Sequence, residues 1–367
     1  MKKIMIVFGT RPEAIKMCPV VKEMQKRQEF QTVVCVSGQH REMLDQVLDA
    51  FDVIPDYDLS IMTQEQTLFD ITTKILLEMQ RVLELERPDM VLVHGDTSTS
   101  FVSALASFYL GIPVGHVEAG LRTYDINSPY PEEFNRQAIS VISQLNYAPT
   151  EWARENLLRE GKKSANIYVT GNTVIDALQT TVRDDYSSEY LDWVGSENRL
   201  ILITAHRREN FGIPMENMFR AIRRIVEEHD DLKALYPIHM NPIVRKTADK
   251  ILKGCDRIKL IEPLDVIDFH NIMANSYLIL TDSGGIQEEA PSLGIPVLVM
   301  RDTTERPEGV EAGTLKLVGT NENVIYNTCK NLIENDQEYV RMSSIKNPYG
   351  DGFASERIVD SLSKILL

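Results

Sequence analysis

Two acidic residues in the first half of the chain follow apolar segments that are typical of buried strands, and a third comes shortly after them. Asp96 ends the sequence VLVHGD, Glu118 follows GHV, and Glu132 comes shortly afterwards in SPYPEEFNR. Consecutive parallel strands bring their carboxyl ends to one edge of a sheet, so we expect Asp96 and Glu118 to lie close together. Grouped carboxylates can act as general acid and base. The alternative is a structural role for each acid, with its charge balanced by Arg122 or Arg136.

A pair of glycines after another apolar segment is suited to an anionic ligand. In LILTDSGGIQEEA, residues 278–290, we expect a strand to end at Thr281 and a helix to begin around Gly284 with Ser283 as its cap. Glycines let a ligand approach the backbone, and free N–H groups at a helix N-terminus favour an anion such as a diphosphate. One of the two glutamates that follow, Glu288 or Glu289, would then accept hydrogen bonds from the sugar hydroxyls of a nucleotide. The alternative is an ordinary helix whose first acids match its dipole.

Clusters of cationic side chains follow other apolar segments. One lies in VFGTRPEAIKM and another in LITAHRRENFG. Ligands of open α/β sheets bind at the carboxyl ends of the strands, so these cations are candidates for holding an anion. The alternatives are solvated surface cations in the first cluster and a salt-bridge cluster with Glu209 in the second. The candidate residues are Arg11, Lys16, His206, Arg207 and Arg208, together with Arg306 in RDTTERPEG and His239 in YPIHMNP.

Other catalytic classes leave no motif in the sequence. There is no HExxH, no GxSxG, no His or Cys spacing for a metal, and no GxGxxG after the first apolar segment. We therefore expect neither a metal ion nor a serine nucleophile, and no bound cofactor.

These residues need a scaffold, and the pattern around them predicts an α/β fold. Short β-branched segments alternate with longer helical patterns, which is typical of parallel sheets. We expect two doubly wound, Rossmann-like domains that face each other across a cleft. The boundaries are placed at 1–172 plus 350–367 for the first domain and at 173–349 for the second, with a C-terminal helix that packs back on the first. The expected strands are 4–8, 32–36, 90–94, 112–117, 200–204, 278–281 and 296–300.

The composition excludes some partners. The chain has 367 residues, 43% of them hydrophobic, and a net charge of −15, which repels nucleic acid and anionic membrane surfaces. The four widely spaced cysteines are interpreted as free thiols in a reducing compartment. The apolar run after Lys3 is too short for a signal peptide, and no segment is long enough to span a bilayer. We expect a soluble cytoplasmic protein.

Eight sequence strings together resemble one family, the non-hydrolysing UDP-N-acetylglucosamine 2-epimerases. The resemblance covers nearly the whole chain, in order. It implies the GT-B fold that is shared with nucleotide-sugar glycosyltransferases, and interconversion of UDP-GlcNAc and UDP-ManNAc by anti elimination of UDP to 2-acetamidoglucal and re-addition. Such an enzyme supplies ManNAc units for cell-surface polysaccharide. The strings are FGTRPEAIKM, SGQHREML, VHGDTSTS, GHVEAGLRT, PYPEEFNR, TAHRREN, TDSGGIQEEAPSLGIPVLVMRDTTERPEG and NPYGDG.

The resemblance also implies roles for individual residues. Glu289 would take the ribose hydroxyls, and Phe269 would meet uracil through its backbone, while Leu264 stands where some members have glutamine. The family is commonly dimeric, and residues 67–86 could supply a dimer surface or belong to the core. The implied catalytic residues are Asp96, Glu118, Glu132 and His206; the substrate-binding residues are Arg11, Lys16, Phe269, Ser283, Gly284, Gly285, Glu289 and Arg306; and the set for a second, activating UDP-GlcNAc is Gln39, His40, Gln66, Arg207 and His239.

Three alternatives share parts of this site. A GT-B glycosyltransferase would use the same donor but needs an acceptor pocket. A hydrolysing epimerase would admit water and release free ManNAc. A nucleotide-sugar sensor without catalysis would not need Asp96, Glu118 and Glu132 together.

Overall fold

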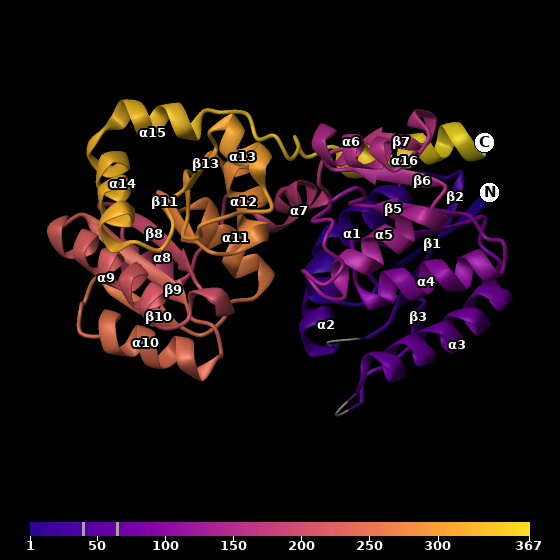
Figure 1. The fold of residues 1–367 in the computed structure, drawn as a ribbon, viewed down its shortest axis with the longest axis horizontal. Coiled ribbons are helices and arrows are strands. Elements are labelled where there is room, and N and C mark those ends of the chain that lie inside the picture. The colour runs from indigo at the N-terminus through magenta and orange to yellow at the C-terminus, as the bar shows by residue number, and fades with distance from the viewer. Residues whose placement is uncertain (39–40, 64–65) are drawn as a thin grey trace. The chain divides into compact units, whose positions relative to one another are not determined.

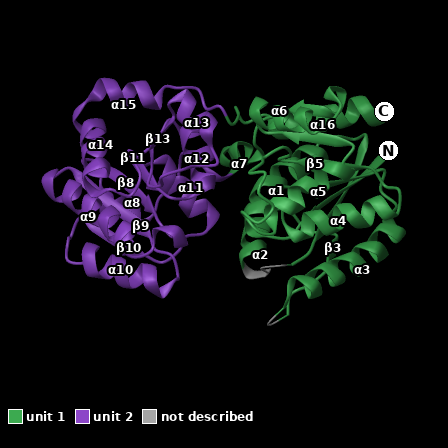
Figure 2. Cartoon of the chain, viewed as in Figure 1, with its two compact units in different colours: residues 1–180, 349–367 green, residues 181–348 purple. Residues whose placement is uncertain are grey.

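The chain folds into two compact units. The computed structural model describes residues 1–38, 41–63 and 66–367 (Figure 1). Unit 1 comprises Met1–Thr180 and Tyr349–Leu367, and unit 2 comprises Thr181–Pro348, as Figure 2 shows. The first boundary falls near the end of helix α7 (Thr173–Thr181) rather than at 172, and the second falls at 348 rather than 349.

Unit 1 is built on a doubly wound parallel sheet. In its described part the strand order is β3-β2-β1-β4-β5-β6-β7. The order changes direction between β1 and β4, the place where ligands of such sheets bind. The elements are β1 Lys2–Phe8, α1 Arg11–Gln25, β2 Phe30–Val36, α2 Arg41–Ala50, β3 Tyr57–Asp58, α3 Leu68–Glu86, β4 Met90–His94, α4 Ser98–Tyr109, β5 Val114–Val117, α5 Glu132–Ile142, β6 Leu145–Ala148, α6 Glu151–Arg159, a 3-10 turn at Ser164–Asn166, β7 Ile167–Val169, α7 and α16 Ala354–Leu366.

Unit 2 repeats this plan with a second parallel sheet. Its strand order is β10-β9-β8-β11-β12-β13, with the change of direction between β8 and β11. The predicted pair of doubly wound, Rossmann-like domains is confirmed. The elements are α8 Glu189–Val194, β8 Arg199–Thr204, a 3-10 turn at Arg208–Asn210, α9 Ile213–Glu228, β9 Leu232–Pro237, α10 Pro242–Leu252, β10 Ile258–Ile261, α11 Val266–Ala274, β11 Leu278–Thr281, α12 Gly284–Glu289, a 3-10 turn at Ala290–Leu293, β12 Val297–Val299, α13 Pro307–Ala312, β13 Leu315–Leu317, α14 Glu322–Glu334 and α15 Asp336–Ser343.

The C-terminal helix α16 returns to unit 1 and packs against α1, as predicted (Figure 1). Ile358 and Leu362 are fully buried, whereas Phe353, directly before the helix, and Ile365 are exposed. Asp176 in α7 accepts hydrogen bonds from the backbone N–H groups at the start of α16. This contact explains why α7 belongs to unit 1 and why the boundary falls later than the sequence suggested.

Among the described residues, no helix is both long enough and apolar enough to cross a lipid bilayer.

Candidate functional site

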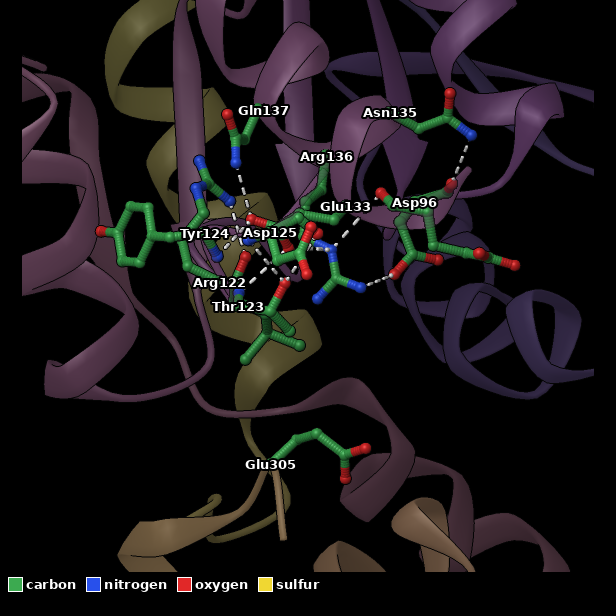
Figure 3. Close-up of polar contacts among 12 residues, drawn as sticks. Asp96, Arg122, Thr123, Tyr124, Asp125, Glu133, Asn135, Arg136, Gln137 and Glu305 are labelled. Atoms are coloured by element: carbon green, nitrogen blue, oxygen red, sulfur yellow. Dashed lines mark hydrogen bonds and ion pairs between the residues drawn. The ribbon is translucent and has the colours of Figure 1, made fainter. Parts of the chain in front are cut away.

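Asp96 lies in the loop between β4 and α4, at the switch point of the first sheet. Its carboxylate pairs with Arg136 at 3.0 Å, and its carbonyl oxygen accepts a hydrogen bond from Asn135 at 2.9 Å (Figure 3). Although 31% of the side chain surface stays exposed, the surrounding protein raises the pKa of Asp96 to about 6. Desolvation is the main cause, Glu118 and Glu132 add repulsion, and Arg136 opposes the shift. Asp96 can therefore exchange a proton near neutral pH.

Glu118 follows β5 in a backbone conformation that is uncommon for a residue with a side chain. Its φ angle is 62°, in the left-handed region, and such strain persists only where the surrounding structure holds it. Its Oε2 atom pairs with Lys16 from α1 and accepts a hydrogen bond from Asn172 at 3.0 Å. The pairing of His94 with Val117 across β4 and β5 places Glu118 beside the loop that carries Asp96.

Glu132 and Glu133 are adjacent at the start of α5, but their surroundings differ. Glu133 is fully buried and accepts hydrogen bonds from the backbone N–H groups of Thr123 and Tyr124, both at 3.0 Å. It therefore holds the preceding loop in place. Glu132 is only partly buried, and its charge acts on Asp96. Unit 1 thus brings Asp96, Glu118 and Glu132 together.

Arg122 does not balance the charge of these acids, contrary to one expectation from the sequence. Its Nε atom lies 2.6 Å from Glu160, at the end of α6, and its Nη2 atom donates to Ser140 at 2.8 Å. Arg122 therefore ties α5 to α6. Arg136 is the arginine that pairs with Asp96.

His94 lies beside Glu118 and was not identified from the sequence. It is 4% exposed, and its Nε2 atom is 3.7 Å from Glu118 Oε2. Neither ring nitrogen has a hydrogen-bond partner within the described residues. Desolvation lowers the pKa of His94, and the charge of Lys16 adds to this, against the attraction of Glu118, so the ring is neutral at pH 7. The sequence signal was its place directly before Gly95 and Asp96.

Asp282 is the centre of the polar network in unit 2, and the sequence analysis did not assign it a role. It is fully buried and accepts hydrogen bonds from the backbone N–H groups of His206 at 3.0 Å and Arg207 at 2.9 Å, and from Asn210 at 3.1 Å. The pairing of Thr204 with Thr281 across β8 and β11 brings these loops together. Asp282 thus fixes the backbone of the cationic segment.

The salt-bridge cluster with Glu209, which was the alternative for the second cationic cluster, does not form among the residues that the structure describes. Glu209 instead pairs with Arg301 at 2.8 Å, because the short 3-10 turn carries it towards the end of β12. The backbone of His206 and Arg207 is anchored to Asp282.

Two guanidinium groups converge on Gly284. A β-carbon placed at Gly284 would lie 3.7 Å from Nη2 of Arg207 and 3.7 Å from Nη2 of Arg306. Arg306 is oriented by Glu288, whose carboxylate it contacts at 2.5 Å. Two arginines beside a glycine, at the start of a helix, form a site that can hold phosphate groups through charge-assisted hydrogen bonds.

Ser283 does not cap α12 with its side chain, which corrects the expectation from the sequence. It occupies the N-cap position, but its hydroxyl makes no cap hydrogen bond. Its backbone N–H instead donates a hydrogen bond to the hydroxyl of Thr281 at 2.9 Å. The side chain of Gln287 donates to the carbonyl of Ser283 at 3.0 Å. This part of the loop is therefore held by Thr281 and Gln287.

The remaining expected ligands of unit 2 lie around α11 and α12. Glu289 Oε2 is 3.5 Å from His270 Nε2, and its other oxygen is 3.3 Å from the β-position of Gly285. The backbone N–H of Phe269 donates a hydrogen bond to the carbonyl oxygen of Asp265, the N-cap of α11, at 3.0 Å. His206 stacks on His239 with ring centroids 5.3 Å apart.

The set expected for a second ligand is divided between the two units. Gln39 and His40 lie outside the described residues. Gln66 belongs to unit 1 and donates to the carbonyl of Ile61 at 2.6 Å. Arg207 and His239 belong to unit 2, where Arg207 lies with Arg306 at Gly284.

The described part of the chain contains no group of three or more His, Cys, Asp or Glu side chains that could hold a metal ion.

Replacing Arg136 by Gln is expected to shift a pH limb of activity upwards. Arg136 lowers the pKa of Asp96, so its removal should raise that pKa by about one unit, as loss of a nearby opposite charge does. A limb of kcat/KM near pH 6 would then move to higher pH, whether Asp96 acts as base or acid. The pH profile of kcat/KM measures this shift. Arg154→Gln, which removes an arginine that pairs with Glu151 on α6, is the matched control. An unmoved limb in the Arg136 variant would assign that limb to another group.

Several known proteins that are similar to this chain in sequence or in structure belong to one enzyme family. A family model described as UDP-N-acetylglucosamine 2-epimerase matches residues 22–363. The UDP-N-acetylglucosamine 2-epimerase of Bacillus subtilis is 61% identical over 360 residues, covering 98% of this chain and 94% of that protein. A crystal structure from Listeria monocytogenes matches with a TM-score of 0.95 and 54% identity, over 100% of this chain and 97% of the other. The UDP-GlcNAc 2-epimerase of Neisseria meningitidis, solved bound to UDP-GlcNAc, matches with a TM-score of 0.91 and 50% identity, over 99% and 100% of the two chains.

Proposed function

The chain belongs to the UDP-N-acetylglucosamine 2-epimerase family, and on that premise we propose that it interconverts UDP-GlcNAc and UDP-ManNAc without hydrolysis. The observation that carries this proposal is the arrangement of carboxylates in unit 1, where Glu118 is fixed by Lys16 and Asn172 beside the loop in which Arg136 holds Asp96. Family membership favours the epimerase over a glycosyltransferase, a hydrolysing epimerase or a sensor.

The carboxylates of unit 1 suit the difficult step of such a reaction. A hydrogen on C2 of the sugar is hardly acidic until positive charge develops at C1 as the diphosphate leaves. Asp96, with a pKa of about 6, can take or return that proton near neutral pH. Glu118, held by Lys16 and Asn172, supplies a second fixed carboxylate, and Glu132 a third. Proton transfer on both faces of C2 requires at least two such groups.

Unit 2 supplies the proposed grip on UDP. Arg306 would hold the diphosphate at Gly284, with Ser283, Gly285 and His206 around it, and Glu289 would accept hydrogen bonds from the ribose. A fixed cationic site stabilises the negative charge of the leaving UDP, which is the interaction that promotes elimination. The structure of the Neisseria meningitidis relative with bound UDP-GlcNAc supports this choice of ligand.

The proposal is tested by incubating the purified protein with UDP-GlcNAc alone in deuterium oxide and following the reaction by NMR. We expect a mixture that contains UDP-ManNAc, with deuterium at C2 of the sugar. A reaction that yields only free ManNAc and UDP would refute the non-hydrolysing mechanism. The same assay started from UDP-ManNAc, with and without a trace of UDP-GlcNAc, tests whether a second UDP-GlcNAc activates the protein. The position of Arg207 beside Arg306 supports such a neighbouring ligand.

We also propose that the chain forms a homodimer. Helix α3 buries Ile75 and Met79 in the core of unit 1 but exposes Phe69, and the end of α4 exposes Phe108 and Tyr109. A second copy could cover these apolar side chains. Sedimentation velocity checks this, since a monomer at all concentrations would rule it out. The cytoplasmic location expected from the sequence stays a prediction.

A further inference from the structure

Glu13 is a buried carboxylate in the first turn of α1. It is 2% exposed, and its Oε2 atom accepts hydrogen bonds from the backbone N–H groups of Gly9 at 3.0 Å and Thr10 at 2.8 Å. The hydroxyl of Thr10 donates to the same oxygen at 2.9 Å and accepts from the N–H of Glu13. These contacts form a capping box, which by itself needs only one carboxylate oxygen.

The other oxygen of Glu13 reaches a different part of the sheet. Oε1 accepts hydrogen bonds from the hydroxyls of Thr97 at 2.6 Å and Ser100 at 2.9 Å, both at the start of α4. The parallel pairing of β1 with β4 brings the two helix starts side by side. Glu13 therefore links the loop after β1 to the loop after β4.

Gly9 allows this close approach. A β-carbon at Gly9 would lie 1.9 Å from Ser37 Oγ and 2.6 Å from Thr99 Oγ1, distances at which side chains clash. Backbone without a side chain is therefore required where the two loops meet. The link by Glu13 is part of a tightly packed arrangement.

The two linked loops carry residues of the proposed site. Thr10 directly precedes Arg11, and Thr97 directly follows Asp96. The carbonyl of Asp96 is held on its other side by Asn135. A shift of either loop would change the separation of Arg11 and Asp96, and small displacements of reacting groups reduce rates strongly.

We propose that Glu13 is a positioning residue that sets the loop of Asp96 against the loop of Arg11, an inference that rests on the proposed epimerase function. Glu13 does not move the C2 proton. It acts through Thr97, whose hydroxyl it orients, and through the backbone of Thr10.

Replacement of Glu13 by Gln should weaken the link selectively, because it removes the negative charge that accepts the protons of Thr97 and Ser100. Two backbone N–H groups donate to the Oε2 position and cannot reverse, so the amide oxygen must take that position. The NH2 group then faces Thr97 and Ser100. Ser100 can donate instead to the carbonyl of His94, 2.5 Å away. Thr97, which already accepts from the N–H of Ser100, then exchanges the charged acceptor of its proton, Glu13 Oε1 at 2.6 Å, for the more distant hydroxyl of Ser100 at 3.3 Å.

The experiment compares Glu13→Gln, Thr97→Val and the double variant. Each is assayed for kcat from UDP-GlcNAc, deuterium incorporation at C2 and affinity for UDP, well below its Tm. We expect a loss of kcat and of exchange of at least fivefold in each single variant and a smaller loss of UDP affinity, because Arg207 and Arg306 of unit 2 are unchanged. The double variant should be no worse than the poorer single variant, since both changes break one link.

Two matched controls disrupt the N-terminal caps of other helices, α3 and α6. Asp70→Asn disrupts the capping box of α3, in which Asp70 Oδ2 accepts hydrogen bonds from the N–H and the hydroxyl of Thr67. Thr150→Val removes the side-chain cap of α6. Both controls should keep kcat within about twofold of the wild type.

Each outcome decides the inference. A loss of kcat below fivefold in the single variants, additive losses in the double variant, or equal losses in the controls would overturn the positioning role. If Glu13→Gln does not fold, Thr97→Val decides by the same threshold, because it leaves the capping box of α1 intact. Wild-type protein without C2 exchange would instead refute the proposed function itself.

Discussion

Replacing Glu118 by Gln is expected to remove epimerisation while leaving UDP affinity within about tenfold, or roughly 1.4 kcal/mol. Positioned acids and bases contribute about 10²-fold to 10⁴-fold to a rate, and Gln has the shape of Glu without its ability to exchange a proton. The side chain is held by Lys16 and Asn172 and is 11% exposed, so a substitute of the same size should stay in place.

The measurements are kcat, deuterium exchange at C2 and calorimetric binding of UDP. Some loss of Tm is expected, because Lys16 loses its ion pair with Glu118. Glu160→Gln is the matched control, since Glu160 is also paired with a cation of unit 1, Arg122, but holds no role in the site. A large loss of UDP affinity in the Glu118 variant would mean that Glu118 binds the substrate, and retained turnover would mean that Glu118 takes no part in catalysis.

Replacing Arg306 by Ala should reduce both ligand binding and stability, through different interactions. Loss of charge-assisted hydrogen bonds to the diphosphate is expected to weaken UDP binding about 100-fold, or roughly 3 kcal/mol. Removing one partner of a buried ion pair costs about 3 to 5 kcal/mol of unfolding free energy. We expect the lower end of this range, because Glu288 is 2% exposed but Arg306 keeps 16% of its side chain in solvent.

A second substitution separates the two effects. In Arg306→Ala with Glu288→Gln, the buried carboxylate is neutralised, so stability should recover in large part while UDP affinity stays low. Urea unfolding and calorimetry measure the two quantities. Arg245→Ala, which breaks an exposed ion pair with Glu262, is the control and should change neither by much. Recovery of UDP affinity in the double variant would mean that Arg306 acts on the site only through folding.

Most strands of the two sheets could be predicted from the sequence. The predicted strands are present in the structure because buried parallel strands are continuous runs of Val, Ile and Leu, as in β1 and β8. Strands such as β6 and β10 were not predicted. They are short and interrupted by polar residues, and the side-chain oxygen of Asn146, buried within β6, accepts a hydrogen bond from Ser143. That compensation is invisible in a local pattern.

The chemistry of the site was also visible in part. Asp96 and Glu118 were identified because each directly follows an apolar segment, and Glu13 was recognisable only as the last residue of TRPE, which fits a capping box. The link from Glu13 to Thr97 could not be inferred, because the two residues are far apart in the chain and meet only through the pairing of β1 with β4.

By itself, the sequence determined the fold class, the strand ends that carry acids and cations, and the family. Only the tertiary structure decided which charges meet. It assigned Arg136 rather than Arg122 to Asp96, used Glu133 to hold a loop, and brought Arg207 beside Arg306. The physical reason is that hydrogen bonds and ion pairs act over a few ångströms between elements remote in the chain, whereas a sequence pattern records only which face of its own element is buried.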